Sequence, residues 1–156
     1  GYAIAQNMKN VVIAFNIKNK YDGIYRLQGR HTRSPYLFPY DKEVHMVTNG
    51  PTEVKFYLPE YSSTGHYIGT SPGAVSWYGA DVSPSVIFNG TTDVATSIYN
   101  LSSAVTIGFY TGTDGGVSRF VDNATPTNRK MYLYFQYNGN PLRGFLDTLT
   151  YIKPRP

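Results

Sequence analysis

The sequence has no cysteine among its 156 residues, and this absence excludes a disulfide framework, thiol chemistry and any metal site built on cysteine ligands. Long apolar runs are absent as well. The most apolar early segment, residues 11–15, is far shorter than the roughly 20 residues of a membrane-spanning helix. No secretory signal peptide is visible, and the chain opens at Gly1 without an initiator methionine, which indicates a mature or excised fragment.

Helical periodicity is also missing. Only residues 2–10 suggest a helix, and they are short and weakly patterned. Alternation is present instead: in the run from Glu53 to Leu58, Val54 and Phe56 point one way and Lys55 the other. Such runs, rich in Val, Ile, Thr, Tyr and Phe and mostly bounded by turn residues, predict strands at 24–29, 43–47, 53–58, 85–89, 94–99, 105–110, 131–137 and 144–152.

These short, closely spaced strands predict an all-β fold. Sequential hairpins favour an up-and-down, lipocalin-like antiparallel β-barrel of about eight strands. An immunoglobulin-like β-sandwich is the alternative, although its Cys–Trp–Cys hallmark is missing. We expect residues 1–18 to be a lead-in strand or linker from an upstream domain, and residues 19–156 to form the barrel. We further expect the last strand to close the domain by pairing with an early one.

Charge gives little indication of a partner. The net charge is +4, and residues 1–33 carry six basic residues and one acid. These basic residues alternate with apolar ones and no nucleic-acid-binding motif accompanies them, so they indicate a solvated strand face and no nucleic-acid partner.

Catalytic signatures are absent. His31, His45 and His66 are isolated in sequence and show no metal-ligand spacing, so we expect no metal site. No Gly-x-Ser-x-Gly motif is present, and nothing singles out a pair of carboxylates for glycoside hydrolysis. The sequence therefore predicts neither an enzyme nor a cofactor, and a binding or structural role is favoured.

Aromatic residues are abundant, with fifteen Tyr, eight Phe and one Trp. Four of them, Tyr61, Tyr67, Trp77 and Tyr78, lie with His66 in the long irregular segment 59–85. This segment interrupts the strand pattern but could pair briefly at 66–68 and 75–78. Sugar rings stack on aromatic faces and their hydroxyls need polar partners. The candidate ligand-binding residues are Tyr36, Tyr40, Tyr61, His66, Tyr78 and Asp81.

Trp77 has two interpretations: a core or barrel-end plug, or a platform for a ligand. Adjacent residues of an extended segment point to opposite sides. We therefore expect Trp77 to pack inward and Tyr78 to face solvent beside Asp81.

Three stretches resemble a known family. They are "FNIKNKYDGIYRLQGR" at 15–30, "SWYGADVSPSVIF" at 76–88 and "PLRGFLDTLTYIKPRP" at 141–156. They are similar to the C-terminal β-rich domain of secreted surface lipoproteins of Bacteroidetes-type gut bacteria, in which a domain of unknown function precedes the barrel. The closing pattern of that family is matched by Arg143, Phe145, Asp147, Tyr151, Ile152, Pro154 and Arg155.

The resemblance implies an exported protein associated with the outer membrane or cell surface, held there only by a lipid anchor outside this fragment. It implies a non-catalytic module, with a glycan as ligand in a polysaccharide-utilisation context. The alternatives are a structural spacer or interaction domain of a surface lipoprotein, and a lipocalin-like carrier of a small apolar ligand.

Overall fold

The computed structural model describes residues 17–123 and 128–156. The weak helical pattern at 2–10, and the expected lead-in except for Ile17 and Lys18, lie outside the described residues. The regular structure named in the described chain consists of strands and two short 3-10 helices, η1 (Pro59–Tyr61) and η3 (Pro141–Arg143). None of its helices is long and apolar enough to span a bilayer.

The strands follow the alternating runs of the sequence. They are β1 (Gly23–His31), β2 (Tyr40–Gly50), β3 (Glu53–Leu58), β4 (Ser63–Thr64), β5 (Tyr67–Ser71), β6 (Ala74–Trp77), β7 (Pro84–Phe88), β8 (Ala95–Asn100), β9 (Ile107–Phe109), β10 (Arg119–Val121), β11 (Lys130–Tyr137) and β12 (Gly144–Lys153). All eight predicted strands are confirmed, with shifted ends. Arg143 of the closing motif lies just before β12, in η3.

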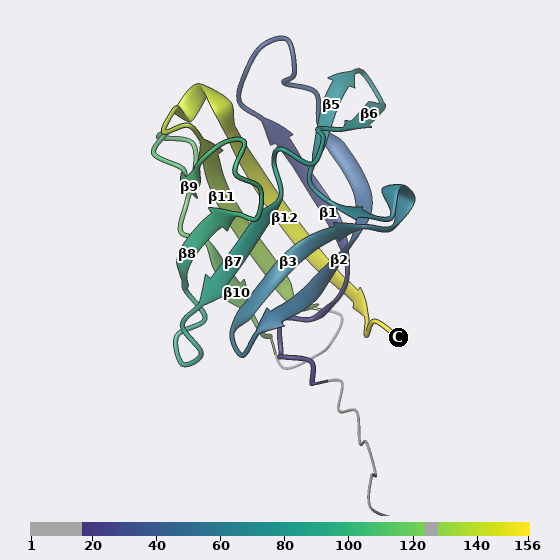
Figure 1. Ribbon diagram of the computed structural model, residues 1–156, viewed down its shortest axis with the longest axis vertical. Coiled ribbons are helices and arrows are strands. Elements are labelled where there is room, and N and C mark those ends of the chain that lie inside the picture. Colours follow the sequence, from purple (N-terminus) through teal and green to yellow (C-terminus); the bar gives the residue numbers. More distant parts are fainter. Residues whose placement is uncertain (1–16, 124–127) are drawn as a thin grey trace, which may run out of the picture.

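The strands form a nearly closed antiparallel barrel, so the predicted up-and-down arrangement is confirmed (Figure 1). The main sheet runs in the order β10-β11-β12-β1-β2-β3-β7-β8, with β4 beside β3 and β9 beside β11. Its two ends approach each other, since the Ala95 amide donates to Ser118 O at 2.9 Å and the Phe120 amide to Asp93 O at 2.8 Å. These bonds shield edges that would otherwise be open to other strands.

The expected closure by the last strand is confirmed. β12 pairs with β1 from Ile24↔Lys153 to His31↔Phe145, and on its other side with β11. Gly23, at the start of β1, allows this packing, because a Cβ there would lie 2.6 Å from the Tyr151 ring.

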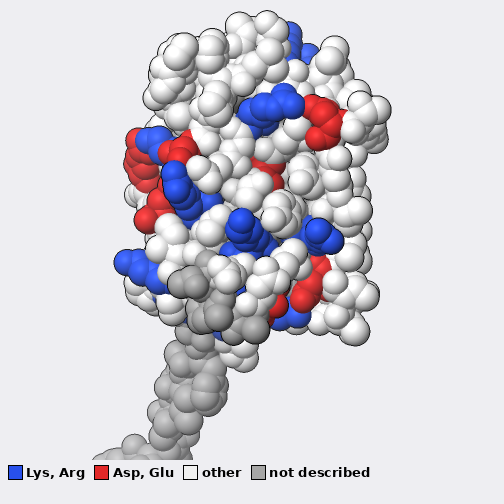
Figure 2. Space-filling model, turned by 180° about the vertical axis from the view of Figure 1, so that it is seen from behind, with Lys and Arg blue, Asp and Glu red and all other residues white. Residues whose placement is uncertain are grey.

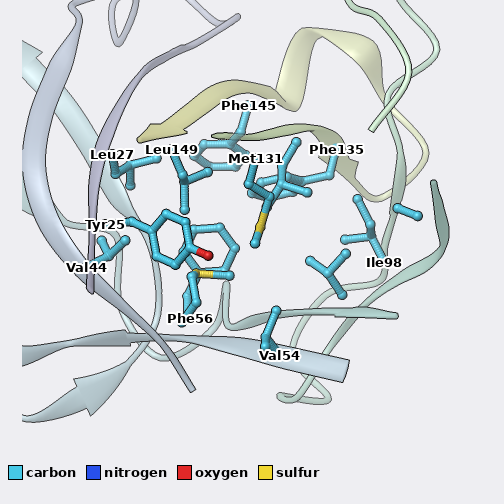
Figure 3. Packing of buried hydrophobic residues seen from close by; sticks show 14 of the residues in the cluster. Tyr25, Leu27, Val44, Val54, Phe56, Ile98, Met131, Phe135, Phe145 and Leu149 are labelled. Carbon is cyan, nitrogen blue, oxygen red and sulfur yellow. The ribbon is translucent and has the colours of Figure 1, made fainter. Parts of the chain in front are cut away.

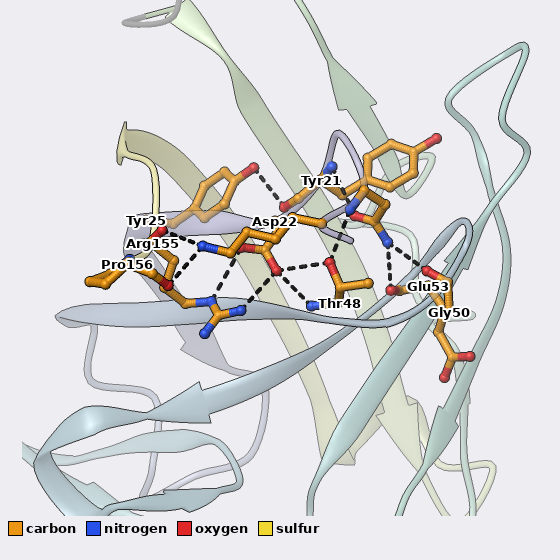
Figure 4. Close-up of polar contacts among 10 residues, drawn as sticks. Tyr21, Asp22, Tyr25, Thr48, Gly50, Glu53, Arg155 and Pro156 are labelled. Carbon is orange, nitrogen blue, oxygen red and sulfur yellow. Dashed lines mark hydrogen bonds and ion pairs between the residues drawn. The ribbon is translucent and has the colours of Figure 1, made fainter. Parts of the chain in front are cut away.

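A carboxylate clamp holds the two ends of the described chain together (Figure 4). Both oxygens of the buried Asp22 carboxylate accept from the Arg155 guanidinium, at 3.2 and 3.1 Å, and the Thr48 amide donates to it at 2.8 Å. Burial raises the pKa of Asp22, but the hydrogen bonds from Arg155 and Thr48 outweigh this effect and leave the pKa below its ordinary value. Lys18 Nζ also donates to the Pro156 carbonyl at 2.7 Å.

The barrel interior is filled by inward-pointing side chains from the surrounding strands (Figure 3). The labelled members are Tyr25, Leu27, Val44, Val54, Phe56, Ile98, Met131, Phe135, Phe145 and Leu149, of which only Ile98 has measurable exposure, at 4%. Phe135 and Phe145 stack with ring centroids 4.8 Å apart. Small barrels are often filled by their own side chains in this way.

The irregular segment 59–85 forms a cap beside one end of the barrel. Its predicted pairing is confirmed as the β5–β6 hairpin, with Tyr67 opposite Trp77 and Ile68 opposite Ser76. In Figure 1 this hairpin lies at the upper end, away from the C-terminus at the lower end.

Candidate functional site

The six sequence-predicted ligand-binding residues do not share one surface. Tyr40 and His66 are buried in the interior, with exposures of 1% and 0%. Tyr61 and Tyr78 are half-buried at the cap, whereas Tyr36 and Asp81 are exposed in separate loops.

Tyr40 and His66 meet on Asp147, a buried carboxylate of β12. His66 Nε2 lies 2.9 Å from Asp147 Oδ2, and the Tyr40 hydroxyl donates to Asp147 Oδ1 at 2.5 Å. The His66 imidazole also contacts the rings of Phe56, Phe135 and Phe145 at centroid distances of 5.2, 5.3 and 4.5 Å. Burial, and then the Asp147 charge, raise the pKa of Tyr40 well above its usual value. This network anchors the cap to the barrel and is closed to solvent.

The cap aromatics also pack against the barrel. Trp77 is half-buried and packs against the core cluster, as the plug interpretation requires, and its ring stacks on Tyr61 with the centroids 5.4 Å apart. The expectation that Tyr78 faces solvent is wrong. Its ring stacks on His31 at 6.2 Å and its hydroxyl bonds with that of Tyr137, because the chain leaves the strand at Trp77 and turns Tyr78 back over the barrel end. The cap therefore presents fewer free rings than its composition predicts.

An aromatic groove lies instead on the outside of the barrel, at the β10–β11 pair and the loop before β10. It consists of two adjoining hollows of about 260 and 230 Å³ that share Gly116, Val117 and Tyr134. We call it the Tyr134 groove; its lining is Ala95, Phe109, Tyr110, Gly116, Val117, Ser118, Arg119, Tyr132 and Tyr134. Each hollow is smaller than the roughly 300–1,000 Å³ of typical ligand pockets, and together they fall within that range.

Strand alternation places the rings of this groove. On β11, Met131, Leu133 and Phe135 point inward, so Tyr132 and Tyr134 project from the outer face and are half-buried. Phe109, on the neighbouring β9, is 41% exposed. Tyr132 and Tyr134 line one hollow, and Phe109, Tyr110 and Tyr134 line the other.

Part-buried hydrogen bonds hold the loop that forms the other wall. The Tyr134 amide donates to Ser118 Oγ at 2.9 Å, and this hydroxyl donates back to the Tyr134 carbonyl at 3.3 Å. Gly116 lies close to the Tyr134 ring, since a Cβ there would be only 3.1 Å from it. The groove is therefore a built feature of the barrel wall.

Polar groups border the groove. The Arg119 guanidinium lies over the Tyr132 ring, 5.9 Å from its centroid. At the other end, Asp114 accepts from the Tyr110 hydroxyl at 2.6 Å and from Arg30 at 2.7 Å. Burial, and then the Asp114 hydrogen bond, raise the pKa of Tyr110 to about 12. The hydrogen bonds from Tyr110 and Arg30 lower the pKa of Asp114.

Other parts of the described surface fit a ligand less well. A hollow of about 530 Å³ beside Ile17, Asn19 and the β2–β3 turn is larger, but its lining includes no aromatic ring and no charged side chain. Within residues 17–123 and 128–156, no three His, Asp or Glu side chains are arranged to hold a metal ion. Figure 2 shows one face of the molecule, on which charges of both signs are interspersed.

Sequence reasoning missed this groove. The alternation in 131–137 is sufficient to place Tyr132 and Tyr134 outward, but the rings of Tyr61, Trp77 and Tyr78 in the irregular segment favoured the cap as the site. Arg119 lies in a strand of three residues, too short for a periodic signal.

Comparisons with known proteins indicate the fold alone. No family model and no curated protein matches the chain. A solved structure from Bacteroides ovatus, described as a structural-genomics protein of unknown function, is similar to 86% of this chain with a TM-score of 0.54 and 15% sequence identity. The match spans 42% of that protein. The barrel therefore has a structural counterpart that forms less than half of a longer chain.

Proposed function

We propose that this barrel is a non-catalytic, cell-surface binding module that holds a glycan in the Tyr134 groove. The observation that carries the proposal is the outward pair Tyr132 and Tyr134, which lines adjoining hollows in the barrel wall. Sugar rings present apolar C–H faces to aromatic rings, and polar groups at the border can bind their hydroxyls. The proposed site contains none of the six residues that the sequence suggested.

The remaining parts of the proposal rest on the sequence resemblance. It supports export to the outer membrane or cell surface, with a lipid anchor and an upstream domain outside this fragment. The counterpart in Bacteroides ovatus agrees with that resemblance in its source organism, although its own function is unknown.

A structural spacer is the second candidate. The packed interior favours it over a carrier of apolar ligands, because the core positions that could line a lumen are occupied by residues such as Phe135 and Phe145.

A glycan array followed by calorimetry on the hits tests the proposal. Tyr134→Ala should weaken binding at least tenfold, which corresponds to about 1.4 kcal/mol. Tyr57→Ala is the matched control, since Tyr57 is a half-buried, outward residue of β3, four strands away from β11 in the sheet. An array without hits, or hits whose affinity is unchanged by Tyr134→Ala, would favour the spacer.

A further inference from the structure

Two cations beside the groove have no acidic partner within the described chain. Arg119 is exposed. Its guanidinium lies over the Tyr132 ring and forms no ion pair with a described residue. Lys130 is half-exposed and forms no ion pair with a described residue. Six other basic side chains, Lys20, Arg26, Arg30, Lys42, Arg129 and Arg155, are paired with carboxylates.

The strand register brings these two cations to the same aromatic ring. Arg119 lies directly opposite Tyr132 in the β10–β11 pair, and Lys130 lies opposite Val121. Lys130 is two residues from Tyr132 on β11 and is therefore on the same outer face. Diagonal neighbours in an antiparallel pair are roughly 7–8 Å apart, so Arg119 and Lys130 flank Tyr132.

The nearby acids are already engaged. Asp114 accepts from Tyr110 and Arg30, and Asp122 accepts from Arg129 at 3.0 Å. Neither hollow is lined by an acidic residue. Arg119 and Lys130 therefore place two positive charges beside Tyr132 that no ion pair with a described residue neutralises.

We propose that the Tyr134 groove selects an acidic glycan, whose carboxylate or sulfate binds Arg119 and Lys130 while its ring lies on Tyr132 or Tyr134. This inference rests on the proposed glycan-binding function. The planar guanidinium can donate two parallel hydrogen bonds to a carboxylate or sulfate, and such charge-assisted bonds are stronger than those to neutral hydroxyls. An acidic sugar therefore gains from both cations, whereas a neutral one leaves them solvated.

Single-stranded nucleic acid also combines anionic groups with stacking rings. It requires a positive groove that follows the backbone over several nucleotides. Here the outer face of β10–β11 carries only two cations without an ion pair to a described residue, Arg119 and Lys130, and the hollows are short. These features favour a sugar acid.

Calorimetry with matched ligands tests the inference. The probes are an oligogalacturonate and its methyl ester, in which a neutral ester replaces each carboxylate, and a sulfated oligosaccharide with its desulfated form. The charged member of at least one pair should bind at least tenfold more tightly, and added salt should reduce this preference. Arg119→Gln and Lys130→Gln should each diminish it, and Arg119→Lys should restore part of the loss. Lys55→Gln is the control, because Lys55 is a half-buried, outward residue of β3, four strands away from β11 in the sheet.

The outcomes separate the two proposals. Equal binding of charged and neutral forms, with Tyr134→Ala still abolishing both, would overturn acidic selectivity and leave glycan binding standing. If Tyr134→Ala affects neither form, the proposed function itself fails. Tighter binding of an oligouridylate than of any acidic sugar would overturn the inference in favour of nucleic acid, and no binding of any charged probe would also overturn it.

Discussion

The hydrogen bonds of His66 determine where its protons lie. Nδ1 is 2.8 Å from the Tyr67 carbonyl, which can only accept, so Nδ1 carries a hydrogen. Nε2 is 2.9 Å from Asp147 Oδ2, and one further proton must lie between these atoms to make the contact attractive. The pair is therefore either imidazolium with carboxylate or imidazole with carboxylic acid, and it is neutral overall in both forms. A buried, neutral and fully bonded pair avoids the cost of an isolated buried charge.

An amide at position 147 should satisfy the same partners. In Asp147→Asn, the side-chain oxygen accepts from Tyr40 and the amide donates to His66 Nε2, so the free energy of unfolding should change by less than about 1.5 kcal/mol. Asp147→Ala leaves both partners unsatisfied and should lower the free energy of unfolding by about 3–5 kcal/mol. Urea denaturation of both variants measures the difference, and equal losses would show that the negative charge is essential.

His31 predicts a dependence of stability on acid pH. Its Nδ1 accepts from the Arg33 amide at 3.0 Å, and its Nε2 has no hydrogen-bond partner in the described structure. Tyr78 and Phe145 pack on its ring. Burial, and then the proximity of His66, lower the pKa of His31 from 6.5 to about 4.

Between pH 6.5 and about 4, the unfolded chain therefore binds more protons at His31 than the folded chain does. Stability contributed by neutral His31 is complete above pH 6.5 and decreases as the pH falls towards 4, by about 2 kcal/mol. His31→Asn keeps an acceptor for Arg33 and should flatten this part of the curve. Denaturation at a series of pH values, compared between the two proteins, checks the prediction. A parallel decline in both would contradict it.

At the scale of elements, alternation is the informative signal where a strand has one face in the core. Strands β3 and β11 could be predicted from the sequence because their inward residues alternate with outward ones. The inward residues include Val54 and Phe56 on β3, and Met131 and Leu133 on β11. Two kinds of feature could not be predicted from the sequence. β10 is too short for a period, and the approach of His66 to Asp147, 81 residues apart, depends on how the cap folds back. Tyr78 was misplaced for the same reason.

Because Tyr78 packs within the cap, we expect Tyr78→Ala to lower the free energy of unfolding. The ring contacts His31, Tyr137 and Phe145, so its loss should reduce the free energy of unfolding by about 2 kcal/mol, less than for a fully buried ring. Tyr78→Phe removes only the bond to Tyr137 and should cost about 1 kcal/mol. Thermal melting of both variants tests this, and an unchanged melting temperature for Tyr78→Ala would show that the ring contributes nothing to the cap.

At the scale of the whole molecule, the barrel depends on its last strand. β12 pairs with β1 and β11 and supplies Phe145, Asp147 and Leu149 to the core. Deleting residues 143–156 opens the sheet and should abolish cooperative unfolding. Deleting only residues 154–156 removes Arg155, the partner of Asp22. The barrel should still form, but its free energy of unfolding should fall by about 3 kcal/mol. A sharp melting transition in the longer deletion would contradict this account.

The central claim is that ligand binds the outer face of β10–β11 and not the cap. An amide chemical-shift titration of the isotope-labelled protein with an oligogalacturonate tests it most directly. The account predicts that the largest shifts map to Gly116, Val117, Arg119, Tyr132 and Tyr134, with Tyr61, Trp77 and Asp81 unaffected. Shifts concentrated at the cap residues, with none around Tyr134, would contradict it.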